Sequence, residues 1–509
     1  MNLIKSTGTF SFFTLISRLL GYLRDVLIAI FLGSGPIADA FFVAFRIPNT
    51  FRRLFSEGTF NAAFVPSYTS EKVRGIKNSK KFAGKIFNLL LLSLLILTIL
   101  AEIFMPNFIF LIAPGFNENS DKFDLTVKLT RITFPFLLFV SLSSFFSAIL
   151  NSHNKFAIAA ASPIILNIFL IFALLYFDNL ENNLVLGVSY IISLSGVVQL
   201  LTLIFFTKKF YFPKISLNFK IDKKIKKFFR KLLPSIFASG VTQINILVGT
   251  IIASFQASAV SYLYYADRIY QINLAIAGIA IGAVVLPKLS EYIKTNNTAK
   301  IKFIQNKAIE LSLFLSLPAT LALLISAEEI TSALFGYGSF DYEGVINSAS
   351  ALFYFSLGLP AYSLTKIFSS FLFARDNTKI PFYFSLISVI INIFLSLYFF
   401  NDYGFIIIPI ATTVAAWFNT FLLLIFVISK NYFSTHETFK INVLRIFLTN
   451  ILVIFIYYKL ISFFHNYLSY NSEFKLLTIL LIVIFTFIIY IIVSIFTKAF
   501  KVSDIKQKY

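Results

Sequence analysis

Apolar stretches of about 20 residues, long enough to cross a bilayer as helices, recur along this whole chain. Of its 509 residues, 58% are hydrophobic and 13% are charged. Soluble proteins carry about 25% charged residues, so the composition indicates a membrane protein. We predict about fourteen spans, near 9–31, 37–62, 84–105, 127–150, 156–177, 184–207, 231–254, 259–286, 303–326, 346–373, 381–400, 404–428, 441–463 and 475–496.

Several classes of function lack the residues they need. Residues 1–13 have no small-residue cleavage site and run into the first span, so we expect no cleaved signal peptide. The chain contains no cysteine, which excludes disulfides and thiolate sites. Its histidines, His153, His436 and His465, lie in predicted loops or at span ends. Without a carboxylate pair or nucleophile motif, we expect a transporter rather than an enzyme, with no metal site and no cofactor.

The polar loops alternate in charge, and this alternation predicts the orientation of the chain. Basic residues gather at 72–81, 208–227 and 498–508, and acidic residues at 118–124, 178–181 and 328–343. The basic loops should be cytoplasmic, with both termini inside. The net charge of +21 then follows mostly from topology, so nucleic acid is not an expected partner, whereas anionic membrane lipids are.

A weak internal repeat organises the spans. The segment 35–49 resembles 257–271 when Arg46 is aligned with Arg268, and Pro135 matches Pro360. The Asn-Ile-Phe triplets at Asn167 and Asn392 match at a similar offset. Six spans are therefore predicted to be duplicated as parallel lobes, an arrangement common in transporters. We assign 1–207 to an N-terminal lobe, 208–230 to a basic cytoplasmic linker, 231–430 to a C-terminal lobe, and 431–509 to two further spans and a tail.

Charged residues lie inside the first two predicted spans. They are Arg18, Arg24, Asp25, Asp39, Arg46, Arg52, Arg53 and Glu57. Each charge at the centre of a spanning helix costs roughly 2.5 to 3.5 kcal/mol, so these side chains should face water or partners. We therefore predict a polar, cationic cavity inside a helix bundle.

Helical geometry arranges this cluster further. Residues seven apart lie within about 20° of one another, so Asp39, Arg46 and Arg53 should form one stripe, as Arg18 and Asp25 do on the first span. Glu57 is one turn beyond Arg53, where an ion pair could form.

Glycine and proline should interrupt these two helices. Gly33 and Gly35 are expected to break the chain between the spans, and Pro48 to bend or break the second.

The surplus of positive charge favours an anionic ligand over structural ion pairs. The first two spans hold five arginines against three acids. In the repeat, Arg268 has Asp267 beside it in sequence but pointing about 100° away. Guanidinium groups donate paired hydrogen bonds to phosphate, so we predict a phosphate-bearing ligand at Arg18, Arg24 and Arg268. For Arg53 with Glu57, a purely structural pair is the favoured interpretation.

The same segments resemble a known family. The runs 17–25 (SRLLGYLRD), 38–49 (ADAFFVAFRIPN), 52–58 (RRLFSEG) and 264–268 (YYADR) are similar to those of the MurJ (MviN) lipid II flippases. This family belongs to the multidrug/oligosaccharidyl-lipid/polysaccharide exporter superfamily. The likeness covers essentially the whole chain.

The resemblance implies a fold and a function. The fold would be that of an all-α integral membrane protein with two parallel, MATE-like six-helix lobes around a cationic cavity, plus two C-terminal helices that take the polyprenyl tail. The function would be to move lipid II, an undecaprenyl diphosphate carrying a disaccharide-pentapeptide, from the inner to the outer leaflet of the bacterial cytoplasmic membrane by alternating access. Cell-wall synthesis proteins are candidate partners.

The resemblance also implies roles for the charged residues. Those matching Arg18, Arg24, Arg52 and Arg268 would bind the headgroup diphosphate. Those implied to act in gating or ion pairing are Asp25, Asp39, Arg46, Arg53, Glu57 and Asp267.

Two departures from the family pattern stand out. Asn273 replaces a proline that often follows the second arginine motif. Some relatives bind sodium through acidic residues, but here the seventh span offers only Gln243 and Asn245, and the eleventh only Asn392. We therefore doubt a sodium site and expect the membrane potential or another ion gradient to drive transport.

Two other functions remain open. One is export of another polyprenyl-linked oligosaccharide; export of a cationic drug would call for an acidic cavity instead. The other is a non-transporting membrane scaffold whose arginines only join helices.

Overall fold

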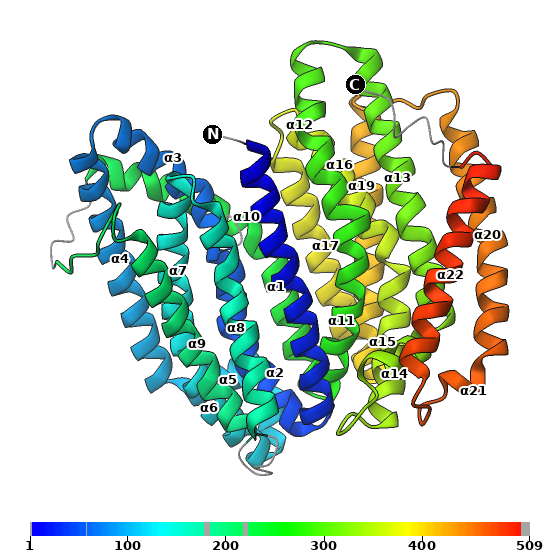
Figure 1. Cartoon of the computed structure of the whole chain (residues 1–509), viewed down its shortest axis with the longest axis horizontal. Helices are drawn as coiled ribbons and strands as arrows, with labels where there is room; N and C mark the ends of the chain where they lie inside the picture. Colours follow the sequence, from blue (N-terminus) through cyan, green and yellow to red (C-terminus); the bar gives the residue numbers. More distant parts are fainter. Residues whose placement is uncertain (1–2, 57–58, 178–183, 217–221, 500–509) are drawn as a thin grey trace. The chain divides into compact units, whose positions relative to one another are not determined.

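Every regular element that the structure describes is a helix. This computed structural model describes residues 3–56, 59–177, 184–216 and 222–499, except for the side chains at 3–8, 10, 51–56, 59, 233–235, 237–239 and 242, and no β-strand occurs in these ranges. The chain divides into two compact units, Met1–Val260 (unit 1) and Ser261–Tyr509 (unit 2). Figure 1 shows the helices of each unit running roughly side by side.

The helices follow the predicted spans closely. Those of unit 1 are α1 (Leu3–Leu32), α2 (Pro36–Ser56), α3 (Thr59–Val73), α4 (Ile76–Ile103), α5 (Met105–Ile112), the 3₁₀-helix η1 (Pro114–Glu118), α6 (Ser120–Thr133), α7 (Pro135–Ser152), α8 (Phe156–Phe177), α9 (Leu184–Thr207) and α10 (Lys223–Ala253). Those that follow are α11 (Ala259–Leu274), the π-helix η2 (Ala275–Ala280), α12 (Ile281–Lys294), α13 (Thr298–Ile325), α14 (Ala327–Phe335), α15 (Tyr342–Leu357), α16 (Leu359–Phe373), α17 (Lys379–Tyr398), α18 (Phe400–Tyr403), the 3₁₀-helix η3 (Gly404–Ile406), α19 (Ile407–Ser429), α20 (Phe439–Phe463), α21 (His465–Leu468) and α22 (Lys475–Phe496).

Ten helical segments in the described ranges are long and apolar enough to cross a membrane. They coincide with ten of the predicted spans. The four other predicted spans, 9–31, 37–62, 231–254 and 346–373, are largely helical as α1, α2, α10 and α15 with α16. The all-α membrane fold predicted from hydropathy is therefore confirmed.

Local sequence explains where these helices begin and end. Gly33 lies in the left-handed region at φ 65°, where α1 has ended, and Pro36 opens α2, as expected from the glycines between the spans. Asn119 and Asp341 accept backbone N–H bonds at the starts of α6 and α15. α2 stays α-helical through Pro48, so the expected break at this residue does not occur.

Matching interruptions support the internal repeat. Pro135 opens α7 directly after α6 ends, and Pro360 lies in the first turn of α16 directly after α15 ends. The turns that follow α7 and α16 correspond too. Asn154 and Asp376 both have positive φ, of 59° and 57°, and each is followed by an amide bonded back across the turn, Lys155 to Leu150 and Asn377 to Leu372.

The departure at Asn273 precedes a change of helix type. The next turn, η2, is a π-helix between α11 and α12. Gly278 lies here against α16, since an added Cβ would come within 3.0 Å of the Cα of Ser363. The helix is therefore irregular close to the position where the family pattern often has proline. Here the irregularity is a π-helical turn.

Near the start of α10, a cluster of aromatic rings is buried in the core of unit 1. The rings of Phe60, Phe64, Phe82, Phe145 and Phe228 pack with centroid separations of 5.2–6.4 Å. These rings come from α3, α4, α7 and α10. The compact unit therefore extends through α10 to Val260, past the predicted linker at 208–230.

The two C-terminal spans are bonded to the rest of unit 2. Asn442 of α20 donates to Glu310 Oε1 of α13 at 3.0 Å, and Tyr490 of α22 donates to the Phe314 carbonyl at 2.7 Å. Lys475 donates to the carbonyls of Gly336 and Tyr470 at 2.5 and 2.6 Å. In Figure 1, α20 and α22 lie side by side, with α22 near α13.

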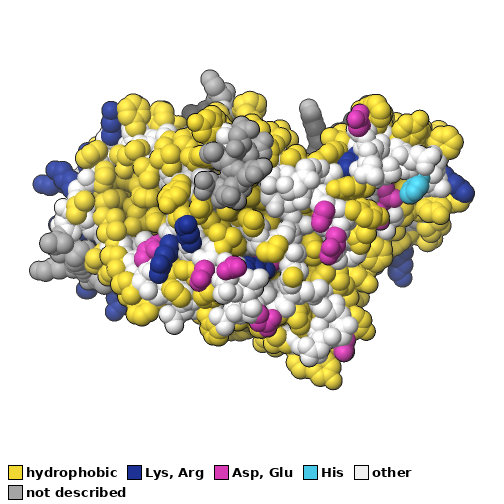
Figure 2. Space-filling model, turned by 90° about the horizontal axis from the view of Figure 1, so that it is seen from below, with side chains coloured by type: hydrophobic (Ala, Val, Ile, Leu, Met, Phe, Trp, Pro, Cys, Tyr) yellow, Lys and Arg dark blue, Asp and Glu magenta, His cyan; other side chains and the backbone are white. Residues whose placement is uncertain are grey.

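The outer faces of many helices are apolar. Large side chains such as Phe394 on α17, Ile451 on α20 and Leu481 on α22 are exposed. Such continuous apolar exposure is rare on soluble proteins and fits contact with lipid. Figure 2 shows the lower end of the molecule, where Asp and Glu side chains and a histidine stand among apolar ones.

Gly115 marks a point where two backbones meet, and its substitution provides a test of this packing. A Cβ there would lie 2.4 Å from the Ser254 carbonyl oxygen and 2.5 Å from Phe255 backbone atoms, which cannot move aside as a side chain would. We expect Gly115→Ala to destabilise the chain by about 1 to 3 kcal/mol, measured as a lower melting temperature of the purified protein.

The matched control is Gly35→Ala, because no atom lies within 4 Å of a Cβ at that position. Equal melting temperatures for Gly115→Ala and the wild type would contradict the close backbone contact.

Candidate functional site

Arg24 is held by three side-chain hydrogen bonds. Its Nε and NH2 groups donate to Oδ1 of Asp25 at 3.0 and 2.6 Å, and its NH1 group donates to Oδ1 of Asn167 on α8 at 3.0 Å. Arg24 is 7% and Asp25 3% exposed. These bonds offset the cost of burying the two charges. They engage three of the five guanidinium N–H donors, so two remain for a ligand.

Arg18 lies one and a half turns before Arg24 on α1, and its side chain is exposed. It forms no hydrogen bond or ion pair with any residue in the described ranges. Its guanidinium therefore has N–H donors that no described residue uses.

Asp39 has a partner that the sequence did not indicate. Lys122 of α6 donates to its Oδ2 at 2.6 Å, and the lysine Nζ lies 3.8 Å from the centre of the Phe116 ring. Asp39 is fully buried and Lys122 is 8% exposed. Lys122 stands among acidic residues in a predicted outer loop, so charge pattern alone gave no reason to single it out. The pair joins α2 to α6.

The predicted stripe on α2 is described only in part. Arg46 donates to the Thr250 hydroxyl on α10. The side chains of Arg52 and Arg53, and all of Glu57, lie outside the described residues, so their predicted roles and the pair between Arg53 and Glu57 stay predictions.

In unit 2, Arg268 and Asp267 lie on α11, and each bonds to a residue one turn away on the same helix. Its NH2 group donates to the Tyr264 hydroxyl at 2.8 Å, and its guanidinium carbon lies 4.5 Å from the centre of that ring. Asp267 accepts from Gln271 one turn on. Both charged residues are half-buried. As predicted from helical spacing, neighbouring charges of opposite sign take different partners here.

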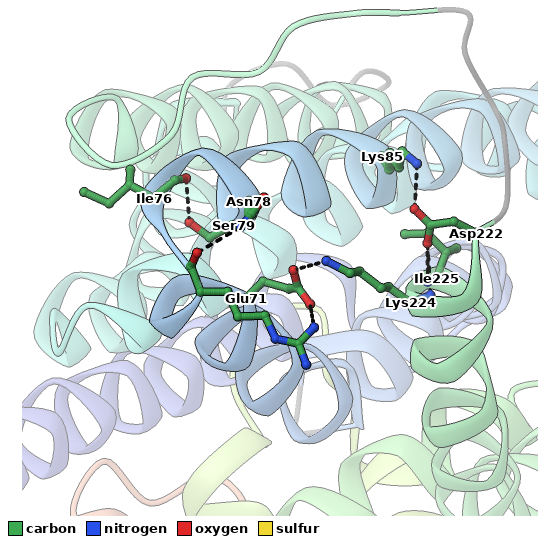
Figure 3. A network of polar contacts seen from close by, with 9 residues as sticks. Glu71, Ile76, Asn78, Ser79, Lys85, Asp222, Lys224 and Ile225 are labelled. Atoms are coloured by element: carbon green, nitrogen blue, oxygen red, sulfur yellow. Dashed lines mark hydrogen bonds and ion pairs between the residues drawn. The ribbon is translucent and has the colours of Figure 1, made fainter.

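Ion pairs attach the start of α10 to α3 and α4 (Figure 3). Glu71 accepts from Arg74 at 3.1 Å and from Lys224 at 2.5 Å. Asp222 accepts from Lys85 Nζ at 2.7 Å and caps α10. Burial raises the pKa of Asp222, but the bonds from Lys85 and the backbone N–H groups outweigh it and lower the pKa below its ordinary value.

The doubted sodium site is not formed from carboxylates in the described residues. Asn392 accepts from the hydroxyls of Ser396 and Thr412 at 3.3 and 3.4 Å. Nowhere in the described ranges do three or more His, Asp or Glu side chains gather closely enough to hold a metal ion.

The fold is one that solved structures of membrane transporters share. An inward-facing multidrug resistance MATE family transporter of the MOP superfamily superposes with a TM-score of 0.67 over 81% of this chain and 94% of the other. At 14% identity this likeness establishes the fold alone.

Closer similarity specifies the family. A family model described as lipid II flippase MurJ matches residues 28–500. Probable lipid II flippases MurJ of Rickettsia prowazekii (strain Madrid E) and Rhizobium tropici are 40% and 39% identical, covering 83% and 82% of this chain and 83% and 80% of theirs. A structure of lipid II flippase MurJ in an inward closed conformation has a TM-score of 0.82 and 27% identity, covering 98% of this chain and 99% of the other. The chain belongs to the MurJ family.

Breaking the pair between Asp39 and Lys122 should be costly. Asp39→Asn leaves a buried ammonium without its carboxylate, and Lys122→Met leaves the reverse, so each should destabilise the chain by about 3 to 5 kcal/mol. The double variant should lose clearly less than the sum of the two. Melting temperatures of all four proteins would check this, and strictly additive losses would show that the two side chains do not interact.

The contribution of Asp222 should depend on pH. Because its folded pKa is lowered, its stabilisation is present above the unfolded value of about 3.9 and is lost as pH falls through the folded value. The side chain is 42% exposed, so solvent screening keeps the effect small. The wild type should melt above Asp222→Asn at pH 7, and this difference should shrink below about pH 4.

Lys85→Met, which removes the donor, should melt below the wild type at pH 7 with the same pH dependence. A difference that stays constant down to pH 3 would contradict the assignment of this effect to the Asp222 carboxylate.

Proposed function

We infer that this chain is a lipid II flippase, which moves the lipid-linked peptidoglycan precursor from the cytoplasmic to the outer leaflet by alternating access for cell-wall synthesis. The observation that carries this inference is membership of the MurJ family across residues 28–500. The chain acts as a transporter and not as an enzyme. It is a multi-pass membrane protein with ten apolar helices in the described ranges.

Four arginines are proposed to bind the diphosphate of the headgroup: Arg18, Arg24, Arg52 and Arg268. In support, Arg18 is exposed, and Arg24 retains two N–H donors beyond those bonded to Asp25 and Asn167. Guanidinium groups match phosphate oxygens in geometry and neutralise charge that hydrocarbon would exclude.

Asp25, Asp39, Arg46, Arg53, Glu57 and Asp267 are proposed to act in gating or ion pairing. The bonds from Asp25 to Arg24 and from Asp39 to Lys122 support this for two of them. Exchange of such partners would let helices move without leaving a charge unbonded.

The polyprenyl tail is proposed to lie along α20 and α22. Both helices expose long rows of apolar side chains, including Leu444, Ile451, Leu477 and Phe485. Keeping the tail in lipid leaves only the polar headgroup to be carried by the protein.

The membrane is proposed to be the bacterial cytoplasmic membrane, with both termini cytoplasmic. The basic residues at 72–81 and 208–227 support this orientation. A return step driven by the membrane potential would gain about 2.3 kcal/mol per charge per 100 mV. The neutral set at Asn392, Ser396 and Thr412 gives little reason to propose sodium instead.

Complementation tests the function and its site together. Bacteria depleted of their own flippase should regain lipid II at the outer leaflet when this chain is expressed. Each charge-assisted hydrogen bond contributes about 1.5 to 3 kcal/mol, so Arg24→Ala and Arg268→Ala should lower the flipping rate at least about tenfold.

Arg230→Ala is the matched control, because Arg230 is exposed on α10 and belongs to no proposed contact. No restoration by the wild type, with the protein present in the membrane, would indicate another polyprenyl-linked substrate or a scaffold. Full activity of Arg24→Ala would exclude the diphosphate contact.

A further inference from the structure

Asn167 connects the arginine motif of α1 to a neighbouring helix. It lies on α8 and is 6% exposed. Its Oδ1 accepts from Arg24 NH1 at 3.0 Å, and its Nδ2 donates to the Ser17 carbonyl at 2.9 Å. The Ser17 carbonyl can only accept, so the amide nitrogen must face Ser17 and the amide oxygen must face Arg24. The orientation of the side chain is thus fixed at both ends.

Gly21 makes this contact possible. A Cβ added to Gly21 would lie 3.5 Å from Nδ2 and 3.7 Å from Oδ1 of Asn167. The amide therefore lies against the α1 backbone, between the levels of Ser17 and Arg24. A side chain larger than alanine at this position would displace it.

The two bonds from Arg24 to Asp25 end on one oxygen. Both Nε and NH2 donate to Oδ1, so the paired arrangement in which each carboxylate oxygen takes one N–H is not adopted. The bond from NH1 to Asn167 holds the opposite edge of the guanidinium. With both edges held, the directions of the two remaining guanidinium N–H groups are fixed.

We propose that Asn167 is a positioning residue for the substrate diphosphate: its amide fixes the orientation of the Arg24 guanidinium, so that its two remaining N–H groups are held in place for phosphate oxygens. This proposal rests on the flippase function inferred above and adds a residue that touches no substrate itself. It requires that loss of the amide weaken lipid II binding through Arg24 alone.

The internal repeat supports a specialised role. The corresponding residue of unit 2, Asn392 on α17, bonds to the hydroxyls of Ser396 and Thr412. The triplet asparagine thus bonds to Arg24 in one unit and to two hydroxyl groups in the other. A residue needed only to pack helices would not require a charged partner in one copy.

A double-mutant cycle separates positioning from packing. The chain is purified at full length in lipid nanodiscs, and its affinity for lipid II is measured for the wild type, Arg24→Lys, Asn167→Leu and the double variant. We expect Asn167→Leu to weaken binding about tenfold, comparable to one lost charge-assisted bond. In the Arg24→Lys background, Asn167→Leu should weaken binding less than twofold, because lysine cannot use the amide as the guanidinium does.

Asn167→Asp is the second variant and guards against loss of folding. It keeps the size and an acceptor oxygen, but its charge would compete with phosphate for Arg24. We expect it to remain folded and to bind lipid II more weakly than the wild type. Wild-type affinity for Asn167→Asp would overturn the proposal.

Asn88→Leu is the matched structural control. Asn88 is also a buried asparagine of unit 1, and among the described residues it bonds only to backbone groups of Gly84, Lys214 and Ser216. Its loss should lower the melting temperature and leave lipid II affinity within twofold of the wild type.

The outcomes distinguish a failure of the positioning role of Asn167 from a failure of the proposed flippase function. Equal losses from Asn167→Leu with arginine or lysine at position 24 would reduce Asn167 to a packing residue and overturn the proposal. Weakened binding in Arg24→Lys with none in Asn167→Leu would refute the positioning role but keep the arginine contact. Failure of the wild type to bind lipid II would refute the proposed function itself.

Discussion

The cost of placing charge in hydrocarbon governs this structure. An unbonded charge at the centre of a spanning helix is expensive, and an uncompensated buried charge is more so. Buried charges of unit 1 meet that constraint through their bonds: Arg24 bonds to Asp25 on its own helix and to Asn167 of α8, and Asp39 bonds to Lys122 of α6. The bonds that make these charges tolerable also hold α1 against α8 and α2 against α6.

Hydropathy and spacing predicted the helices because both are local properties. The predicted spans 156–177, 184–207 and 475–496 coincide with α8, α9 and α22. Pro135 and Pro360, noticed only as repeat landmarks, open the second halves of two interrupted spans. Of the bend or break predicted at Pro48, the break is wrong, because a proline within a membrane helix can be accommodated without ending it, and the bend stays a prediction.

The partners of the charges were not predictable in the same way. Helical spacing placed Asp39 and Arg46 on one stripe, but their bonds go to Lys122 and Thr250, which are remote in sequence. Asn167 entered the sequence argument only through its triplet, and its bond to Arg24 depends on how α8 packs at Gly21. Tertiary packing decides such pairings, and a single sequence carries no direct record of it.

The π-helix at 275–280 gives the second arginine motif a property that an ordinary helix would lack. A π-turn holds one residue more than an α-turn, and each residue corresponds to about 100° of rotation. If this turn became α-helical, α11 would turn by about 100° relative to α12. Asp267 and Arg268 are adjacent and point about 100° apart, so the arginine would then occupy the direction previously taken by the acid. A slip of one residue would thereby reverse the sign of the charge that one face of α11 presents.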